Sequence, residues 1–387
     1  MELQVTDAFL AAQYAGNGLF AKIIDSPADE AMRTGFTLDG LDRAARDICE
    51  DALAVLGWDM VAATAIKWGR LFGGSLVVML ADDGGSLEDP LNLDKVTRID
   101  SLVLYDRSEV ASVELENGTP ERFHVQSRRG CFTVHASRCL VFRNEVTPER
   151  SSNVDYWGIP VYYRIHKALD DYQEAHRGAV GLLQRLGQGV YRMQGLADIL
   201  ATEDGENQVI QRLQALDMAR GMLNTVVVDG EGEDYGFASF SVAGVPDVIY
   251  SAGCMLSAVT HIPASILFGR RWLRRDQLGP LTSSSSPASL ETWHSYVERL
   301  QQHTIRHNLH RLLSVILRAG ANMGQLDTVP AFAVRFNPLR VPRGSEITQA
   351  ELDRARAGLA RAMAAETYVH SGVLLPQEVR QSLKRKR

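Results

Sequence analysis

The chain has few cysteines, and they are scattered. Its four cysteines in 387 residues are Cys49, Cys131, Cys139 and Cys254, and no two of them form a Cys-x-x-Cys pair. Proteins that depend on a disulfide framework concentrate cysteine in a short secreted chain. The pattern here excludes that class and indicates reduced thiols, as in a cytosolic protein.

Long hydrophobic runs are missing as well. No apolar stretch approaches the roughly 18 residues that a membrane-spanning helix needs. The first residues, MELQVTD, lack the basic segment of a signal peptide. Hydrophobic residues make up 45% of the chain and charged residues 23%, which is typical of a soluble globular protein. The length predicts two or three domains, and we find no internal repeat.

A complete catalytic motif is also absent. The segment GRLFGGS at 69–75 resembles a phosphate loop, but no lysine precedes Ser75 and no strand precedes Gly69, so we interpret its glycines as a tight helix-to-strand turn. His135-x-Ser137 resembles half of the paired His-x-Thr/Ser motif of cyclic-nucleotide phosphodiesterases. That chemistry needs two such histidines, one as base and one as acid. Without a second copy in a strand-like context, we interpret His135 as part of a structural strand.

Three histidines share one face of a predicted helix, at spacings of four and three residues: His303, His307 and His310. A His-x-x-x-His pair can hold zinc, but Thr304 stands where a zinc protease has glutamate, and no carboxylate or cysteine completes the set. A polar interface face is the better interpretation, and we expect no metal or cofactor.

Charge is distributed unevenly along the chain. The net charge is −6, so the protein as a whole is not a general nucleic-acid binder. Residues 262–288, however, hold four arginines against a single acid, Asp276, and the last four residues are KRKR. An acidic body with small basic spots fits transient contact with DNA better than stable storage of it.

The basic segment lies inside an ordered series of predicted elements. A helix at 206–222 is followed by strands at 225–228 and 237–242, which flank an acidic turn. A second helix runs from Pro246 to about Ile262, where Pro263 ends it. After the arginines, Ser286 and Pro287 begin a long helix that continues to about Arg318. One interpretation is an ordinary helical hairpin whose connecting loop carries charged residues. The other is an arrangement in which two rigid helices hold a loop of arginines between them.

The rest of the chain indicates an α+β fold that is mainly α. Periodicity predicts helices at 41–56, 60–72, 159–186 and 347–368, and a short helix at 376–383. Strands are expected at 75–80, 99–105, 111–115, 121–126, 131–142 and 329–336. We expect residues 1–20 to be a loosely held arm.

With these elements placed, several short motifs point to one family. They are IDSPADEAMR at 24–33, HASR at 135–138, GIP at 158–160, GLADIL at 195–200, FSVAGVPD at 240–247, HIPASILFG at 261–269, RFNPL at 335–339 and YVHSGV at 368–373. In this order the chain, from about Leu19 to Arg380, resembles portal proteins of tailed double-stranded DNA bacteriophages. More narrowly, it resembles the subgroup whose portal-like domain also occurs beside a cyclic-nucleotide-cleaving anti-defence domain.

The resemblance implies a portal fold with wing, stem, clip and crown, assembled as a ring of usually twelve subunits at one capsid vertex. Such a ring conducts double-stranded DNA during packaging by a terminase motor and during ejection into the tail. The implied partners are terminase, a head–tail adaptor, and the major capsid and scaffold proteins. The implied location is the virion, after assembly in the host cytoplasm, with no membrane and no enzymatic activity.

Carried onto this chain, the resemblance divides it as follows. Residues 1–20 would be an arm, 21–200 the wing, 201–222 and 246–262 the two stem helices, and 223–245 the clip hairpin. Residues 263–288 would be the tunnel loop, 289–345 the channel-side long helix with its return to the wing, and 346–387 the crown.

The DNA-facing residues implied for the tunnel loop are Arg270, Arg271, Trp272, Arg274 and Arg275. The alternative is a solvated charge run, with Trp272 as local core. One departure matters: the subgroup usually has a Gly/Asn/Thr-rich stretch here, so the resemblance implies the position of this loop but not its detailed shape. In the clip, the resemblance assigns Asp229, Glu231, Glu233 and Asp234 to docking of the motor or adaptor, while the alternative is a soluble turn.

Two other classes of function stay open from the sequence. One is a phosphodiesterase of the anti-defence type, which lacks a second histidine motif here. The other is a DNA-binding scaffold that acts as a monomer or dimer. Native mass separates them, because a portal requires a very large oligomer.

Overall fold

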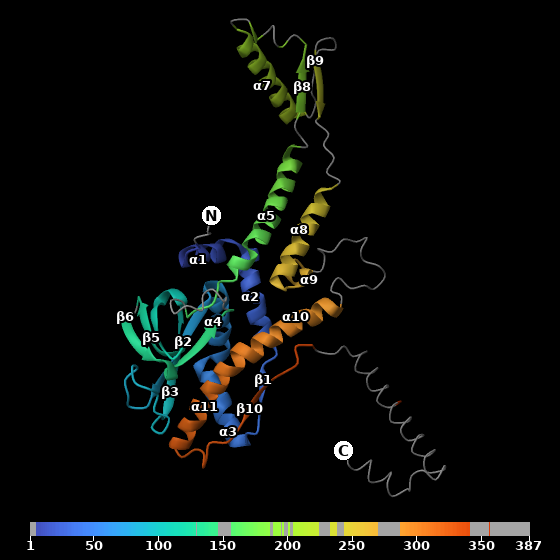
Figure 1. Ribbon diagram of the computed structural model, residues 1–387. Helices are drawn as coiled ribbons and strands as arrows, with labels where there is room; N and C mark the ends of the chain where they lie inside the picture. The colour runs from blue at the N-terminus through green and yellow to red at the C-terminus, as the bar shows by residue number, and fades with distance from the viewer. Residues whose placement is uncertain are drawn as a thin grey trace, which may run out of the picture. The chain divides into compact units, whose positions relative to one another are not determined.

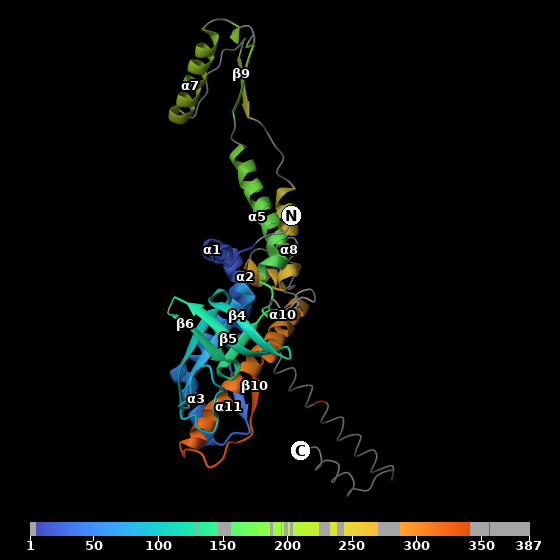
Figure 2. The same cartoon turned by 60° about the vertical axis from the view of Figure 1, so that its left-hand side comes forward.

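The computed structural model describes residues 5–128, 130–145, 156–185, 189–194, 196, 200–201, 204–223, 233–237, 244–269, 287–340 and 356. The chain divides into two units. One comprises Met1–Met32 and Leu38–Arg335, and the other comprises Arg33–Thr37 and Phe336–Arg387. The elements described below belong to the first unit unless stated otherwise (Figures 1 and 2).

The N-terminal segment is helical, which corrects the prediction of a loosely held arm. Helix α1 (Asp7–Gly16) begins at Thr6, whose side chain accepts a hydrogen bond from the Phe9 amide, and it buries Leu10 completely. The first amides of a helix have no carbonyl partner within the helix, and the Thr6 side chain supplies a partner for one of them. The sequence pattern missed the element because α1 is short and only its Leu10 side is buried.

Helix α2 (Gly18–Arg33) follows directly and contains Pro27 in its interior. It is fixed to α1 and α4 by a polar cluster. The Tyr14 hydroxyl donates to Asp25 Oδ1 at 2.8 Å, and Lys67 Nζ lies 2.8 Å from Asp29. Burial, together with the hydrogen bond to Asp25, raises the pKa of Tyr14 to about 12. The Tyr14 hydroxyl therefore stays protonated and remains a donor at neutral pH.

Helices α3 (Arg43–Leu56) and α4 (Trp58–Phe72) confirm the helices predicted at 41–56 and 60–72. Helix α4 packs against a three-stranded antiparallel sheet in the order β3-β2-β7, with bounds Arg98–Asp106, Gly74–Asp82 and Cys139–Arg143. The first six residues of β2 are all buried, as expected for a central strand covered on both faces. The sheet and α4 form the centre of the core.

A second antiparallel sheet has the order β4-β5-β6, with bounds Val110–Glu116, Thr119–Ser127 and Gly130–His135. Its inner face buries Phe123, Val125 and Val134 in one cluster with Leu76 and Trp157. Its outer face carries polar side chains. The alternation follows from the two-residue period of a strand. The strands predicted at 99–105, 111–115 and 121–126 are confirmed. The single strand predicted at 131–142 is wrong, because the helical turn Ala136–Arg138 divides it into β6 and β7, which belong to different sheets.

The turn from α4 into β2 depends on glycine. Gly73 has φ +93°, and a Cβ atom there would lie 2.2 Å from the Gly158 carbonyl oxygen. A Cβ atom on Gly74 would lie 2.0 Å from the Trp157 ring. The interpretation of GRLFGGS as a tight helix-to-strand turn is therefore confirmed. Ser75, which a phosphate loop would aim at a nucleotide, is buried and donates to the Ala65 carbonyl at 2.7 Å.

Helix α5 (Tyr162–Arg185) packs alongside α8 (Val245–Thr260), as both views show. Beyond α5 come strand β8 (Gly189–Met193), helix α7 (Gly205–Leu223) and strand β9 (Glu233–Phe237). The helices predicted at 159–186, 206–222 and 246–262 are confirmed as elements. The packing partner of α8 is α5, however, while the sequence analysis assigned 206–222 as its companion in the stem.

Strand β9 also differs from expectation. It pairs antiparallel with β8, so that Phe237 lies opposite Gly189 and Tyr235 opposite Tyr191. The predicted turn at 229–234 therefore ends earlier, because Glu233 and Asp234 already belong to a strand. The strand expected at 225–228 lies outside the described residues. A strand's partner is set by long-range contacts, which local sequence does not encode.

The long helix predicted at 287–318 is present but interrupted. Helix α10 (Pro287–Leu300) continues through a π-helical turn, Gln301–Ile305, into α11 (Arg306–Asn322). Gln301 is buried at the start of that turn, and its amide donates to the Ala31 carbonyl at 2.8 Å. Asn308 then binds both backbone groups of Val141 in β7, accepting at 3.1 Å and donating at 2.8 Å. A side-chain amide thus satisfies part of the edge of the sheet.

The last described strand, β10 (Ala333–Phe336), pairs with β1 (Phe36–Asp39) and confirms the strand predicted near 329–336. In the second unit, Asn337 donates to the Thr34 carbonyl at 2.8 Å, and Arg33 donates to the Leu339 carbonyl at 2.8 Å. The helices predicted at 347–368 and 376–383 lie in the part of the chain that the structure does not describe, apart from residue 356. No helix in the described part is long and apolar enough to cross a bilayer.

We predict that Gly73→Ala destabilises the subunit by at least about 3 kcal/mol, because it combines a left-handed φ with a clash against backbone. The matched control is Gly84→Ala. Gly84 has φ +73° but nothing within 4 Å of its Cβ position, so only the conformational penalty of about 1–2 kcal/mol remains. Urea denaturation measures both. Equal losses would show that the contact with Gly158 is not tight.

Candidate functional site

The arginine segment singled out by the sequence falls outside the described residues. This applies to Arg270, Arg271, Trp272, Arg274 and Arg275, and in the acidic turn to Asp229 and Glu231. The backbones of Glu233 and Asp234 lie in β9, opposite Met193 and Arg192. The structure does describe the elements before and after the arginines, and these define where that segment is attached.

Helix α8 ends sharply just before the arginine segment. His261 follows it in the left-handed conformation, at φ +57°. The Ser257 hydroxyl then donates to the Ile262 carbonyl at 2.6 Å, which supplies a partner for a carbonyl beyond the helix end. Pro263 precedes a single helical turn, α9 (Ala264–Leu267), and Gly269 is the last described residue before the arginines.

The end of α8 contacts the second half of α10 directly. The imidazole of His261 stacks on the ring of Tyr296, with centroids 5.6 Å apart and planes 24° apart. Tyr296 in turn stacks on Trp293, which is buried, at 6.1 Å. The chain therefore enters and leaves the arginine segment through two elements that hold each other in place.

The Tyr296 hydroxyl is held in place by the buried guanidinium of Arg70. It accepts a hydrogen bond of 2.7 Å from Arg70 Nη1, while Arg70 Nε and Nη2 donate to the carbonyls of Ile24 and Ile23, each at 3.1 Å. Arg70 is only 4% exposed. We refer to Arg70, Tyr296 and His261 as the Arg70 cluster.

Pro27 explains why the carbonyl of Ile23 is available. In a regular helix the amide of residue 27 would donate to the carbonyl of Ile23, but proline has no amide hydrogen. The guanidinium of Arg70 supplies the missing donor. A buried charge without hydrogen-bonded partners would cost several kcal/mol. Pro27 thus leaves the Ile23 carbonyl without an amide donor, and the guanidinium of Arg70 supplies that donor.

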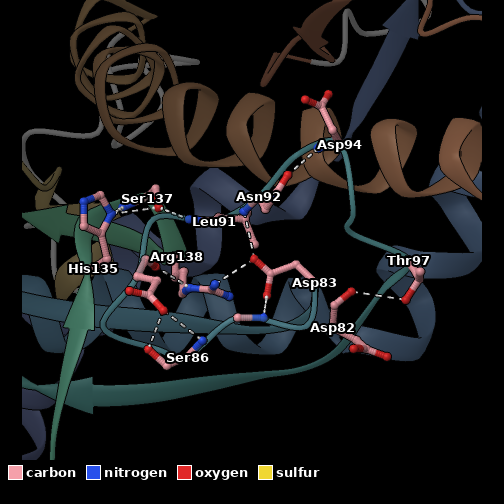
Figure 3. Close-up of polar contacts among 12 residues, drawn as sticks. Asp82, Asp83, Ser86, Leu91, Asn92, Asp94, Thr97, His135, Ser137 and Arg138 are labelled. Atoms are coloured by element: carbon pink, nitrogen blue, oxygen red, sulfur yellow. Dashed lines mark hydrogen bonds and ion pairs between the residues drawn. The ribbon is translucent and has the colours of Figure 1, made fainter.

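His135 lies at the end of β6, where its ring caps the short helical turn Ala136–Arg138 (Figure 3). Its Nδ1 accepts from the Ser137 amide at 3.1 Å and lies 2.8 Å from the Ser137 hydroxyl. That hydroxyl also accepts from the Leu91 amide at 2.7 Å. Burial lowers the pKa of His135, which agrees with a neutral ring that accepts at Nδ1.

The next residue, Arg138, forms a buried ion pair (Figure 3). Its Nη2 lies 2.7 Å from Asp83 Oδ2, and both side chains are 1% exposed. Asp83 also accepts from the amides of Asn92 at 2.8 Å and Gly85 at 3.1 Å. Burial by itself raises the pKa of Asp83, but the hydrogen bonds from Arg138 and the two amides outweigh it, so that this pKa lies below its usual range. The pair closes the 83–92 loop onto β7.

The register of the second sheet brings another histidine near His135. Arg122 lies opposite His135 and His124 lies opposite Thr133, so both histidines occupy the outer face of the sheet. The ring nitrogens of His124 are both engaged, with Thr133 Oγ1 at 3.0 Å and Glu114 Oε1 at 2.8 Å. The hydrogen bond from His124 is the main reason that the pKa of Glu114 is lowered. The sequence missed this juxtaposition because His124 has no His-x-Ser/Thr spacing.

The three histidines of the long helix do not converge on one point. His303 lies in the π-helical turn, His307 is exposed in α11, and His310 stacks on Phe332 at 4.5 Å. Within the described ranges, no group of three His, Cys, Asp or Glu side chains is arranged to hold a metal ion.

The Arg70 cluster was not predicted from the sequence, although two signals were available. A proline occurs inside the helical pattern at 18–33, and an arginine occurs among the buried residues of the helix at 60–72. Each is unfavourable alone. A proline inside one helix and a buried arginine in a neighbouring helix could together have suggested that the arginine donates to a carbonyl near the proline.

The fold is shared with solved particle structures. The chain is similar to a chain in the virion of a native gene transfer agent particle, with a TM-score of 0.52, 13% identity, and 93% of this chain and 91% of that chain covered. It is also similar to a chain in the neck of the native particle, computed with C12 symmetry (TM-score 0.51, 13% identity, 91% and 88% covered). A chain in the neck of the empty particle, computed with C6 symmetry, is similar with a TM-score of 0.52 and 14% identity. The match covers 92% of this chain and 90% of that chain. At these identities the likeness establishes the fold alone.

The family of this chain is shown by its sequence. The model of the phage portal protein family matches residues 9–361. The chain therefore belongs to the phage portal protein family.

The chain is also similar to a curated protein, the anti-CBASS protein Acb1 of Caulobacter sp. (strain RHG1). The two are 25% identical over an alignment that covers 95% of this chain. The chain spans only 59% of the length of that relative. The match agrees with the resemblance to the subgroup whose portal-like domain occurs beside an anti-defence domain.

We predict that Arg70→Met destabilises the subunit by about 2–4 kcal/mol, because two buried carbonyls and the Tyr296 hydroxyl lose their donor. Arg46→Met is the matched control. Arg46 also donates to carbonyls, those of Leu38 and Leu41, but from an exposed position at 3.3 and 3.5 Å, so we expect a loss below about 1 kcal/mol. Urea denaturation monitored by circular dichroism compares the two, and a similar effect of both would contradict the role of the Arg70 cluster.

Proposed function

We propose that this protein forms a ring-shaped portal at one vertex of a phage capsid, through which double-stranded DNA is packaged and later ejected. Membership of the portal family supports this function, as does the fold shared with neck components of gene transfer agent particles, one of which was computed with C12 symmetry. The observation that carries the proposal is the attachment of the arginine segment. It departs from and returns to helices that the Arg70 cluster holds together.

The proposed role of the arginines is to contact DNA phosphates weakly, so that the DNA can slide past them. Arg270, Arg271, Arg274 and Arg275 would face the channel, and Trp272 would anchor the loop against a neighbouring subunit. A twelve-subunit ring cannot match a duplex with about 10.5 base pairs per turn, so no register satisfies all subunits at once. The contacts are then spread along the backbone, and the energy changes little as the DNA slides. Fixed side-chain positions at the base of each loop keep the arginines at one height in the channel.

The described helices suggest how the stem of such a ring would be built. Helices α5 and α8 pack against each other but leave apolar side chains at the surface. Val248 and Met255 in α8 are each 60% exposed, and Val180 in α5 is 44% exposed. Apolar surface of this kind marks an interaction site, and in a ring the neighbouring subunit would cover it. We therefore assign α5 and α8 as the stem pair and α7 with β8 and β9 to the clip.

The clip would carry the docking site for the terminase motor and later for the head–tail adaptor. Asp229, Glu231, Glu233 and Asp234 give this region a negative charge, which would also repel passing DNA. The capsid and scaffold proteins would contact the wing, and the protein would be a structural component of the virion, assembled in the host cytoplasm. A non-enzymatic role follows from this proposal, with translocation driven by the motor.

The first prediction concerns assembly. We expect the purified protein to form rings with a central hole and about twelvefold symmetry, because burial of the exposed residues of α5 and α8 requires neighbours. Negative-stain images and sedimentation velocity at micromolar concentration are the measurements. A protein that remains monomeric or dimeric at moderate salt would instead support a non-ring scaffold.

The second prediction concerns the arginines. Replacing Arg270, Arg271, Arg274 and Arg275 by serine should leave ring assembly intact and impair DNA packaging or retention. Each phosphate contact contributes about −0.9 to the slope of log K against log salt, so the slope for DNA association should flatten measurably. The matched control replaces four exposed basic residues elsewhere with serine: Arg43, Lys95, Arg98 and Arg128. If the loop variant packages normally with an unchanged slope, the arginines do not contact DNA.

A further inference from the structure

The connection between α8 and the arginine segment is held by its own backbone. The Leu267 amide donates to the Pro263 carbonyl at 2.9 Å, and Leu267 is only 2% exposed. The Phe268 amide donates to the Ala264 carbonyl at 2.8 Å. The chain is therefore fixed through the single helical turn α9 as far as Phe268, which is followed by Gly269 and then by the first arginine.

The ring of Phe268 is also held by a different helix. It lies against the ring of Tyr172 in α5, with centroids 5.0 Å apart and planes 31° apart. Aromatic rings attract one another when their centroids are roughly 4.5–7 Å apart. The stack of His261 on Tyr296 joins the end of α8 to α10. The contact of Phe268 lies further along the chain and joins α9 to α5, a helix that the Arg70 cluster does not reach.

Gly269 sets the backbone direction after this contact. It has φ +88°, and nothing lies within 4 Å of the position that its Cβ atom would take. Glycine is therefore required here by the left-handed backbone and not by close packing. An aromatic residue held against α5 determines where the arginine segment begins, and the glycine after it determines the direction in which the chain continues.

We propose that Tyr172, Phe268 and Gly269 are positioning residues for the contact between the arginine segment and DNA; the inference rests on the DNA-contacting role proposed above. An arginine that starts from a fixed point in a fixed direction has less conformational freedom to lose when it meets a phosphate. Pre-organisation of this kind raises affinity without adding a contact. The three residues act through the arginines and not by touching DNA themselves.

The experiment measures how tightly assembled rings of the full chain associate with a fluorescent DNA duplex of mixed sequence at moderate salt. Phe268→Leu and Tyr172→Leu each remove the ring contact, and Gly269→Ala places a side chain where φ is positive. Gly269→Ala meets no neighbouring atom, so it keeps the test valid if loss of a ring disturbs the fold. Circular dichroism and sedimentation velocity establish that each variant is folded and assembled.

Two variants serve as matched controls. Phe9→Leu removes another ring contact of the same helix, because Phe9 lies against Tyr162 of α5 with centroids 5.4 Å apart. Gly324→Ala places a side chain on another glycine with positive φ, at +71°, that likewise has nothing within 4 Å of its Cβ position. Each control repeats the chemical change away from the arginine segment.

We expect Phe268→Leu, Tyr172→Leu and Gly269→Ala each to lower the DNA association constant at least about threefold, and the controls to leave it unchanged. The same three substitutions should have no further effect in rings whose four arginines are already serine, because positioning residues act only through the arginines.

Three results would overturn the inference and leave the portal itself in place. They are wild-type association in the three variants, a loss of the same size in the controls, and a loss of the same size in the four-serine background. If the four-serine variant itself binds DNA like the wild type, the DNA-contacting role proposed for the arginines fails, and the inference fails with it.

Discussion

The hydrogen bonds of Arg70 are the interaction on which the arrangement of the helices that flank the arginine segment depends. A buried guanidinium is costly, and here it is compensated by three oxygens, two of them backbone carbonyls of α2 and one the hydroxyl of Tyr296. Because these acceptors come from different helices, the position of α10 relative to α2 and α4 is fixed by one side chain. The stacking of His261 on Tyr296 extends that constraint to the end of α8.

In the portal proposed above, such a constraint would suit a segment that has to contact moving DNA. Sliding would require contacts that are individually weak, because tight binding would hold the DNA in place. The position of the contacts would nevertheless have to be constant from one subunit to the next. The proposal separates the two requirements, since the buried Arg70 cluster would provide rigidity and the arginines of the segment would provide the labile contacts. A hydrophobic base would also be rigid, but hydrogen bonds specify a single orientation of the helices more strictly.

Much of the fold could be predicted from the sequence, and the exceptions have a common cause. The helices near 41–56, 60–72 and 159–186 and the strands between 99 and 126 follow from the periodicity of their apolar residues. The π-helical turn could not be predicted, because it accompanies the contact of Gln301 with Ala31, 270 positions earlier in the chain. The pairing of β9 with β8 is likewise long-range. For the site, the roles of the arginines and the acidic turn stay predictions from the sequence. The Arg70 cluster could not be predicted, because it joins residues that are 226 positions apart.

The histidines of the second sheet bear on the relation to the anti-CBASS relative. A two-histidine site for phosphodiester cleavage needs one imidazole free to take a proton and another free to give one. His135 uses Nδ1 to cap a turn, and His124 uses both ring nitrogens within the sheet. The sheet thus brings two histidines to one face, where Nδ1 of His135 and both ring nitrogens of His124 serve the local structure of strands and turns. The His-x-Ser pattern of this chain is therefore explained by folding, because His135 caps the turn that contains Ser137.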